Sequence, residues 1–363
     1  MGFKCGLVGL PNAGKSTIFN AMTNLHVDVA SYPFCTIDPH FGMVPLNDSR
    51  LDFIQATIGS TKKTPNILEF IDIAGLVKGA SQGEGLGNQF LSHIGQADAV
   101  CHVIRCFEDE NVSHPYGNLN PVRDAEDITL ELILKDAEWI EKRIRKNRVA
   151  AKSGNTEPKK IIAALEPILD HLNGEKEIRT MKLNEFQQQS VREMNLLTAK
   201  PVIFIANVDE NHLSGSPLVK ALEQYSAGRH APCVPFCGKV QAEIAELSEE
   251  DQLEFLQAMG FKETGLQKII KAGFETLSLI TYFTANENEA RGWTLRAKTP
   301  VVKAAGQVHT DFEEKFIKAE VVKVADLQRQ GSMKFLHDHG LIAIHGKEYL
   351  VEDGDLLLFK IRQ

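Results

Sequence analysis

Short runs of apolar residues alternate along the chain with longer segments of helical periodicity. The apolar runs are KCGLVGL, NILEFIDIA, AVCHVIRC, PVIFIAN and CVPFC, all between residues 4 and 237. Runs that are apolar on both faces and separated by crossover segments are typical of a mostly parallel sheet covered by helices. The pattern therefore predicts one α/β domain, formed by residues 1–122 and 200–277.

Residues 107–200 interrupt this α/β pattern with far more chain than one crossover needs. Apolar side chains recur in the first part of this segment at spacings of three and four, as in an amphipathic helix. These residues are Leu130, Ile133, Leu134, Ala137, Ile140 and Ile144. A second helical run begins at residue 161 and is expected to return antiparallel to the first. The sequence predicts an inserted α-helical hairpin of the coiled-coil type over residues 123–199.

Beyond residue 278 the pattern changes to short apolar runs around one helical segment. The run EYLVEDGDLLLF carries an Asp-Gly pair between two apolar segments, which is the signal of a tight β-hairpin turn. Residues 278–363 are therefore expected to form a small α+β domain.

The segment GLPNAGKS at residues 9–16 matches the pattern GxxxxGK[ST], follows an apolar run and opens a helical segment. In that context the amides of the loop and of the helix N-terminus surround bound phosphates. Lys15 is expected to contact the β- and γ-phosphates during catalysis, and the Ser16 hydroxyl to bind Mg²⁺. The predicted nucleotide-binding residues of this loop are Asn12, Ala13, Gly14, Lys15, Ser16 and Thr17.

The segment DIAG at residues 72–75 closes the run NILEFI and supplies the second part of a phosphate site. Asp72 is expected to hold Mg²⁺ through a water molecule, and the Gly75 amide to meet the γ-phosphate during catalysis. Thr36, in YPFCTIDP, is the candidate for a second hydroxyl ligand to Mg²⁺; the alternative is a plain loop threonine. Leu76 stands where Ras-like GTPases carry the glutamine that orients the attacking water, so another group must do this or the intrinsic rate must be low.

These motifs resemble those of the Obg-like P-loop GTPases, and within them the YchF group. The similarity rests on GLPNAGKS, YPFCTIDP, DIAGLVKGASQGEGLGNQFL, the helical insertion, NVDE and the segment beyond residue 278. The resemblance implies a G domain, an inserted α-helical coiled coil and a C-terminal TGS domain. It also implies a ribosome-associated nucleoside triphosphatase that hydrolyses ATP in preference to GTP.

The segment NVDE at residues 207–210 lies where GTPases carry the guanine-reading sequence NKxD. Val208 replaces the lysine and Glu210 stands at the aspartate position with a side chain one methylene longer, and both changes count against guanine. Adenine offers a donor at N6 and an acceptor at N1, which an amide such as Asn207 can serve, while Val208 can pack against the base. We therefore expect ATP as the first nucleotide and GTP as the second.

The group that activates the attacking water is a separate question. His114, in the loop EDENVSHPYGNLNP, is a candidate because an imidazole suits proton transfer near neutral pH; the alternative is an ordinary surface histidine. Asn12 resembles the asparagine that lets some relatives use K⁺ beside the phosphates, so a K⁺-stimulated rate is a further hypothesis.

A basic segment lies at the turn of the predicted hairpin. Residues 142–160 contain eight Lys or Arg against the single Glu157. Such a density of positive charge predicts a contact with a phosphate backbone, with a solvated helix end as the alternative. The candidate RNA- or ribosome-binding residues are Lys142, Arg143, Arg145, Lys146 and Arg148.

Composition narrows the class of partner and the compartment. A net charge of -8 argues against a mainly electrostatic nucleic-acid binder, although the local basic segment is compatible with one. No apolar run approaches the length of a membrane-spanning helix and no signal peptide is evident, so we expect a cytoplasmic protein without a membrane partner. The six cysteines include no CxxC pair, which favours reduced, buried thiols over a zinc site.

Three functions are compatible with these motifs. The first is an Mg²⁺-dependent ATPase whose loops switch a surface that faces the ribosome. The second is a GTP-dependent RNA-binding protein in which the nucleotide is mainly a structural ligand. The third, a metabolic kinase, is disfavoured because DIAG and NVDE are typical of switch NTPases and no acceptor site is evident.

Overall fold

The computed structural model describes residues 3–23, 41–72, 94–152 and 156–362, and every structural statement below concerns these ranges. The predicted site residues Thr36 and Gly75, and the adjacent Leu76, lie outside them. Within them, no helix is both long and apolar enough to cross a bilayer.

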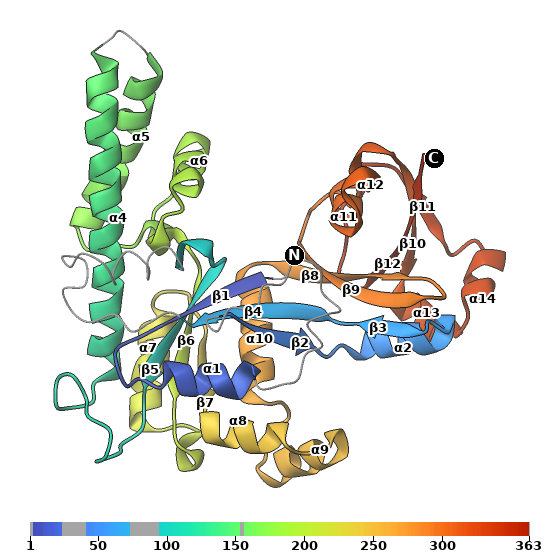
Figure 1. Ribbon diagram of the computed structural model, residues 1–363, viewed down its shortest axis with the longest axis horizontal. Coiled ribbons are helices and arrows are strands. Elements are labelled where there is room, and N and C mark those ends of the chain that lie inside the picture. Colours follow the sequence, from blue (N-terminus) through green and yellow to red (C-terminus); the bar gives the residue numbers. More distant parts are fainter. Residues whose placement is uncertain (1–2, 24–40, 73–93, 153–155, 363) are drawn as a thin grey trace.

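A six-stranded sheet forms the centre of the first domain, with strand order β2-β4-β1-β5-β6-β7 (Figure 1). All neighbouring strands are parallel except β2, which runs antiparallel to β4 at one edge. The mostly parallel sheet predicted from the apolar runs is therefore confirmed. The strands are β1 (Phe3–Val8), β2 (Phe41–Leu46), β4 (Asn66–Asp72), β5 (Ala99–Arg105), β6 (Val202–Asn207) and β7 (Cys233–Phe236).

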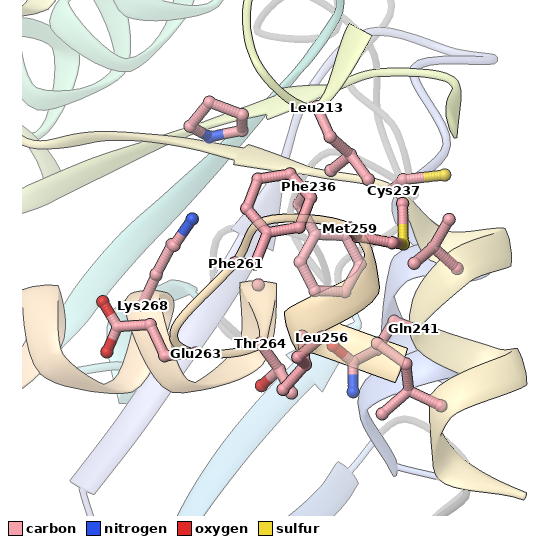
Figure 2. A pocket seen from close by; sticks show the side chains of 14 residues that line it. Leu213, Phe236, Cys237, Gln241, Leu256, Met259, Phe261, Glu263, Thr264 and Lys268 are labelled. Atoms are coloured by element: carbon pink, nitrogen blue, oxygen red, sulfur yellow. The ribbon is translucent and has the colours of Figure 1, made fainter. Parts of the chain in front are cut away.

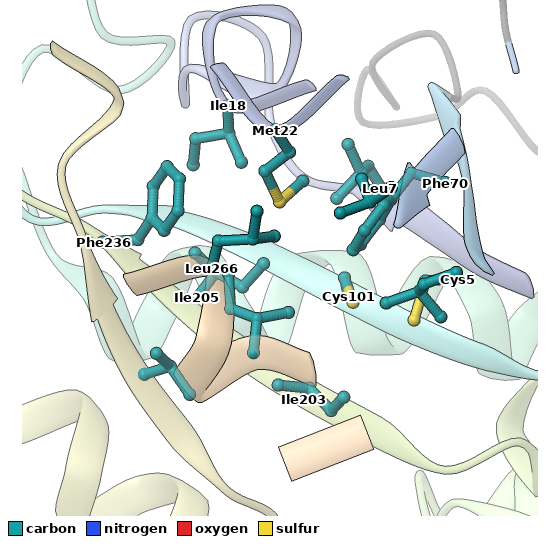
Figure 3. Close-up of a cluster of buried hydrophobic side chains, with 14 of the residues drawn as sticks. Cys5, Leu7, Ile18, Met22, Phe70, Cys101, Ile203, Ile205, Phe236 and Leu266 are labelled. Atoms are coloured by element: carbon teal, nitrogen blue, oxygen red, sulfur yellow. The ribbon is translucent and has the colours of Figure 1, made fainter. Parts of the chain in front are cut away.

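Helices cover both faces of this sheet because its strands are apolar on both sides. Along β5, Cys101 and Val103 pack with α1 and α10 on one face, whereas Val100 and Ile104 pack with α4 and α7 on the other. Figure 3 shows the first of these cores, where Ile18 and Met22 of α1 and Leu266 of α10 lie over the central strands. The covering helices are α1 (Lys15–Thr23), α4 (Pro121–Ala151), α7 (Pro217–Ala227) and α10 (Gly265–Thr276), and α8 (Gly238–Ala245) and α9 (Glu249–Ala258) lie between α7 and α10 in the chain.

The insertion is a helical hairpin, as predicted. Helix α4 has 31 residues, is capped by Asn120, and is about 46 Å long at 1.5 Å per residue. It packs against α5 (Thr156–Asn173), and α6 (Glu185–Met194) joins the same core (Figure 1). The first turns of α4 belong instead to the core of the α/β domain, through Ala125 and Ile128. A single helix therefore connects the α/β domain to the far end of the insertion.

A buried carboxylate of α4 binds the segment that leads from the insertion into β6. Asp136 of α4 is completely buried and accepts hydrogen bonds from the amides of Leu197 (2.8 Å) and Thr198 (2.7 Å) and from the Thr198 hydroxyl (2.7 Å). These residues form the short 3-10 helix η4 (Leu197–Ala199) directly before β6. Burial raises the pKa of Asp136 to about 6, although the hydrogen bonds from Thr198 and Leu197 oppose this.

The C-terminal domain is a second sheet with strand order β11-β10-β12-β8-β9-β3. Sequence analysis predicted one helix in this domain, which is wrong, because four short helices pack on the sheet. The strands are β8 (Leu279–Ala285), β9 (Glu289–Arg296), β10 (Phe316–Lys323), β11 (Ala343–His345) and β12 (Asp355–Ile361). The helices are α11 (Val301–Val308), α12 (Thr310–Glu314), α13 (Val324–Gln330) and α14 (Met333–Asp338).

The hairpin predicted around the Asp-Gly pair is also absent. Only β12 follows the turn, since the backbone of the preceding segment pairs with residues 299–301 instead. The Val301 amide donates to the Tyr349 carbonyl (2.7 Å), and the Val351 amide donates to the Thr299 carbonyl (3.1 Å). The turn itself is present, with Gly354 at φ 82°.

Part of the N-terminal segment lies in the C-terminal domain. Helix α2 (Ser49–Ile58) and strand β3 (Lys62–Thr64) fall within the predicted first domain, yet β3 is the edge strand beside β9. Leu51 and Ile54 of α2 share a hydrophobic core with Phe283 and Leu356. The chain between β2 and β4 therefore belongs to the C-terminal domain, and its predicted place in the first domain is wrong.

Candidate nucleotide-binding site

The loop between β1 and α1 has the shape of a phosphate-binding loop, and its glycines are required by close backbone approach. A Cβ on Gly9 would lie 2.4 Å from the Val103 carbonyl oxygen. A Cβ on Gly14, whose φ is +93°, would lie 2.1 Å from Nδ2 of Asn207. Both distances are shorter than any real Cβ contact, so β5 and β6 fix this loop in place.

The side chain of Lys15 lies on the inner side of the loop and contacts its backbone. Its ammonium group donates hydrogen bonds to the carbonyls of Leu10 (2.9 Å) and Gly9 (3.2 Å), and the residue is buried. Burial lowers its pKa, while the nearby Asp72 opposes that shift. A lysine held in this way places positive charge at the concave side of the loop, where phosphates bind in P-loop proteins.

Ser16 and Asp72 meet where the carboxyl ends of β1 and β4 lie side by side. The Ser16 hydroxyl donates to Oδ2 of Asp72 at 3.2 Å. The other oxygen, Oδ1, is buried and has no hydrogen-bond partner within the described part of the chain. An orphaned carboxylate oxygen beside a hydroxyl fits the oxygen ligands that Mg²⁺ prefers, directly or through water.

Asn207 ends β6 and is buried against the P-loop. Its Nδ2 donates to the Ala13 carbonyl at 2.9 Å. The Asn207 side chain is predicted to contact adenine, but its Nδ2 group binds the P-loop and fixes that loop to the sheet. The neighbouring Val208 is 3% exposed and packs in the domain core, so its side chain is not free on the surface. The proposed contacts of both residues with a base stay predictions.

Glu210 lies on the exposed side of the same loop. Its Oε2 pairs with the ammonium group of Lys239 at 3.0 Å, and both side chains are largely exposed. The hydrogen bond from Lys239 to this carboxylate raises the pKa of the lysine. The segments that follow β6 and β7 therefore lie next to each other, as they would on either side of a base.

The loop that carries His114 lies beside the P-loop. Nδ2 of Asn12 donates to the Ser113 carbonyl (3.1 Å) and to its hydroxyl (3.3 Å). Nε2 of His114 lies 2.8 Å from Oδ2 of Asp124, and Nδ1 of His114 accepts the amide hydrogen of Tyr116 at 3.2 Å. The structure thus brings His114 close to the P-loop, with both ring nitrogens bound to the chain itself.

Two residues that hold this loop were missed by sequence analysis. Arg105, at the end of β5, donates to the carbonyls of Phe107 (3.1 Å), Val112 (2.8 Å) and Asp109 (3.1 Å). Asp124 is buried in the first turn of α4. Arg105, His114 and Asp124 line one small cavity with Leu10, Pro11 and Ala13 of the P-loop. The signal for Arg105 was a charged residue ending an otherwise apolar run; Asp124 carried none.

An apolar pocket lies behind the loop after β7. Figure 2 shows Phe236, Met259 and Phe261 at its centre, with Lys268 and Glu263 on one side. Apart from these charged side chains its walls are largely apolar, and it includes no residue of the P-loop. This pocket is therefore separate from the P-loop.

The basic residues lie at the opposite end of α4 from the P-loop (Figure 1). Two of the five are paired with carboxylates: Lys142 with Glu138, and Arg148 with Glu166 at 2.9 Å. All five side chains are exposed; these are Lys142, Arg143, Arg145, Lys146 and Arg148. The structure brings them together at the tip of the insertion and far from the nucleotide site.

Comparison with known proteins agrees with this geometry. Residues 4–145 match a family described as "50S ribosome-binding GTPase", and residues 279–362 match YchF-GTPase_C, described as a protein of unknown function. The chain is 44% identical to the ribosome-binding ATPase YchF of Bacillus subtilis over 363 residues, with 99% of each chain covered. It is 42% identical to the protein of the same name from Escherichia coli O157:H7, again with 99% of each covered.

Comparison with solved structures also finds similarity to a YchF protein. The YchF GTPase of Schizosaccharomyces pombe superposes with a TM-score of 0.87 at 34% identity, covering 99% of this chain and 97% of that one. A GTP-binding protein from Pyrococcus horikoshii has a TM-score of 0.60 at 16% identity, and this match supports the fold alone. With a P-loop, a Ser16–Asp72 pair and full-length similarity to these proteins, the chain belongs to the YchF family of P-loop nucleotide hydrolases.

Proposed function

We propose that this protein is an Mg²⁺-dependent nucleoside triphosphatase that prefers ATP to GTP and acts as a switch on the ribosome. The observation that carries the proposal is the contact between Ser16 and Asp72 beside Lys15, in a chain 44% identical to a ribosome-binding ATPase. These groups can bind a metal and the terminal phosphates together, which is what phosphoryl transfer to water requires.

Mg²⁺ would be held by Ser16 directly and by Asp72 through water, with Thr36 as the third candidate. The metal would neutralise charge on the phosphate oxygens. Lys15 would balance the remaining charge, since its buried ammonium group already lies on the inner side of the loop.

The base would lie between the segment of Asn207, Val208 and Glu210 and the first turn of α8, which carries Lys239. Guanine recognition needs a carboxylate that is free to accept two hydrogen bonds. Oε2 of Glu210 is paired with Lys239, and the side chain is one methylene longer than the usual aspartate; both features favour adenine.

His114 would take over the role of the missing glutamine by accepting a proton from the attacking water. Its loop already lies against the P-loop through Asn12. K⁺ is a separate hypothesis, in which the ion would bind Oδ1 of Asn12 because Nδ2 is engaged with Ser113. Turnover that is unchanged when Na⁺ replaces K⁺ would remove it.

The experiment is phosphate release from ATP and from GTP at equal concentration, with Mg²⁺ and then with excess EDTA. We expect faster release from ATP, and loss of release when the metal is removed. Faster turnover of GTP would contradict the base preference, and turnover unaffected by EDTA would contradict the metal site.

The exposed basic tip of α4 supports the ribosome part of the proposal, and equally supports the second candidate, RNA binding without a switch. Replacing Arg143, Arg145 and Lys146 by glutamate should weaken ribosome binding about tenfold or more at moderate salt. The matched control replaces three exposed lysines elsewhere: Lys220, Lys334 and Lys347. Equal binding with ATP and without nucleotide would favour the second candidate.

A further inference from the structure

The two ends of α4 lie in different parts of the molecule. Its first turn carries Asp124, which touches His114 beside the P-loop, and its last turns carry the exposed basic tip. The helix is continuous over 31 residues, so its position at one end depends on its position at the other.

The contact between His114 and Asp124 is short and buried. The two side chains are only 8% and 3% exposed, and Nε2 lies 2.8 Å from the carboxylate. Hydrogen bonds to a charged acceptor are roughly twice as strong as neutral ones. Arg123 holds the other carboxylate oxygen at 3.0 Å and also donates to the Asn118 carbonyl at 2.8 Å, so the carboxylate is fixed on both sides.

The ring of His114 has no lone pair available for a water molecule in this arrangement. With its hydrogen on Nε2 donated to Asp124, the lone pair of the neutral ring lies on Nδ1, which accepts the Tyr116 amide hydrogen. A general base must reach the proton that it abstracts, directly or through one water. Hydrolysis therefore requires the ring to turn so that Nδ1 leaves the Tyr116 amide, and the hydrogen bond from Nε2 to Asp124 opposes that rotation.

We propose that Asp124 is a positioning residue that withholds His114 from the nucleotide, and that displacement of α4 releases it. This inference rests on the proposed role of His114 in water activation. The insertion helix would then transmit the signal: a ribosome bound at the basic tip would weaken the contact of Asp124 with His114, about 27–36 Å away along the helix.

The test uses the full chain with Asp124→Asn, which keeps the shape and removes the charge. The control is Glu126→Gln, an exposed carboxylate in the same part of α4. We measure acylation of individual histidines by diethyl pyrocarbonate, with the 81%-exposed His337 as internal reference. Asp124→Asn should raise the acylation rate of His114 about fivefold relative to His337, and Glu126→Gln should leave it unchanged. An unchanged rate for His114 in Asp124→Asn overturns the proposal.

Kinetics then separate this inference from the role of His114 itself. Asp124→Asn should raise kcat for ATP about fivefold with KM unchanged, and it should have no effect on kcat in the His114→Ala background. A fall in kcat with Asp124→Asn would mean that the carboxylate assists hydrolysis, and it would overturn the proposal that Asp124 withholds His114. If His114→Ala alone hydrolyses ATP normally, the proposed role of His114 fails, whatever the acylation rates are.

Discussion

The phosphate end and the base end of the nucleotide site are built in different ways. At the phosphate end, Gly14 lies against the buried Asn207 of β6, and the ammonium group of Lys15 is buried against the loop's own carbonyls. At the base end, Glu210 and Lys239 form an exposed pair between the short 3-10 helix after β6 and the first turn of α8. Buried contacts of fixed geometry tolerate little change, whereas an exposed ion pair contributes little and can be altered gradually. Single substitutions at the phosphate end should therefore cause large losses of activity, whereas those at the base end should change the preference for ATP over GTP only slightly.

Gly14→Ala should have the largest effect. The added methyl group would lie 2.1 Å from Nδ2 of Asn207, so either this side chain gives up its hydrogen bond to the Ala13 carbonyl or the loop shifts. Displacements of about 1 Å at a reaction centre can cost about 100-fold in rate, and we expect at least that loss in kcat/KM for ATP. Gly59→Ala is the control, because Gly59 also has a positive φ (78°) but open space around it. Equal losses in both variants would show that strain at positive φ, rather than the clash, is responsible.

Asp72→Ala should come next. Removing a residue that holds a metal through water typically weakens metal affinity about 10- to 100-fold, so the Mg²⁺ concentration for half-maximal hydrolysis should rise by that factor. Glu69→Gln, on the same strand but paired with Lys4, should leave the Mg²⁺ dependence unchanged. An unchanged Mg²⁺ requirement in Asp72→Ala would remove Asp72 from the metal site.

Asp136 offers a buried contact outside the nucleotide site. Its folded-state pKa of about 6 exceeds the ordinary value of 3.8, so between these pH values the folded chain keeps a proton that the unfolded chain has lost. Its contribution to the free energy of unfolding is thus full below the lower value and falls by up to about 3 kcal/mol as the pH rises to about 6. Urea unfolding across this range should show a flatter profile for Asp136→Asn than for the unaltered chain. Identical slopes would contradict the assignment.

Lys239→Met should have the smallest effect. It frees the Glu210 carboxylate to accept hydrogen bonds from guanine, and exposed pairs of this kind contribute little, so the ratio of ATP to GTP affinity should fall by up to about fivefold. Lys220→Met, at an exposed site on α7, should leave the ratio unchanged. A rise in the ratio would mean that Lys239 contacts the nucleotide itself.

The same contrast explains what the sequence could predict. The parallel sheet, the P-loop and the helical hairpin follow from local signals: apolar runs, a glycine pattern, and spacings of three and four. The pairing of β3 with β9 joins Lys62 to Glu289, far apart in the chain, and no local pattern indicates it. The apolar run at 349–351 reads as a strand, yet its backbone pairs with residues 299–301.

Within the site, motif residues were predictable and their supports were not. GLPNAGKS and DIAG point to Ser16 and Asp72 because the chemistry needs those residue types at those positions. The contacts of Asn12 with Ser113 and of His114 with Asp124 depend on how a fifteen-residue loop folds back, which periodicity does not encode. Val208 is similar: its apolar character was evident, but its burial in the core was not.

The central claim is that NVDE selects adenine, and equilibrium binding tests it most directly. Fluorescent ATP and GTP would be titrated with Mg²⁺ against the unaltered chain and against the double variant Val208→Lys with Glu210→Asp. The account predicts tighter binding of ATP by the unaltered chain and a shift toward GTP in the double variant. Tighter binding of GTP by the unaltered chain would contradict it, and guanine contacts would then have to lie outside these four residues.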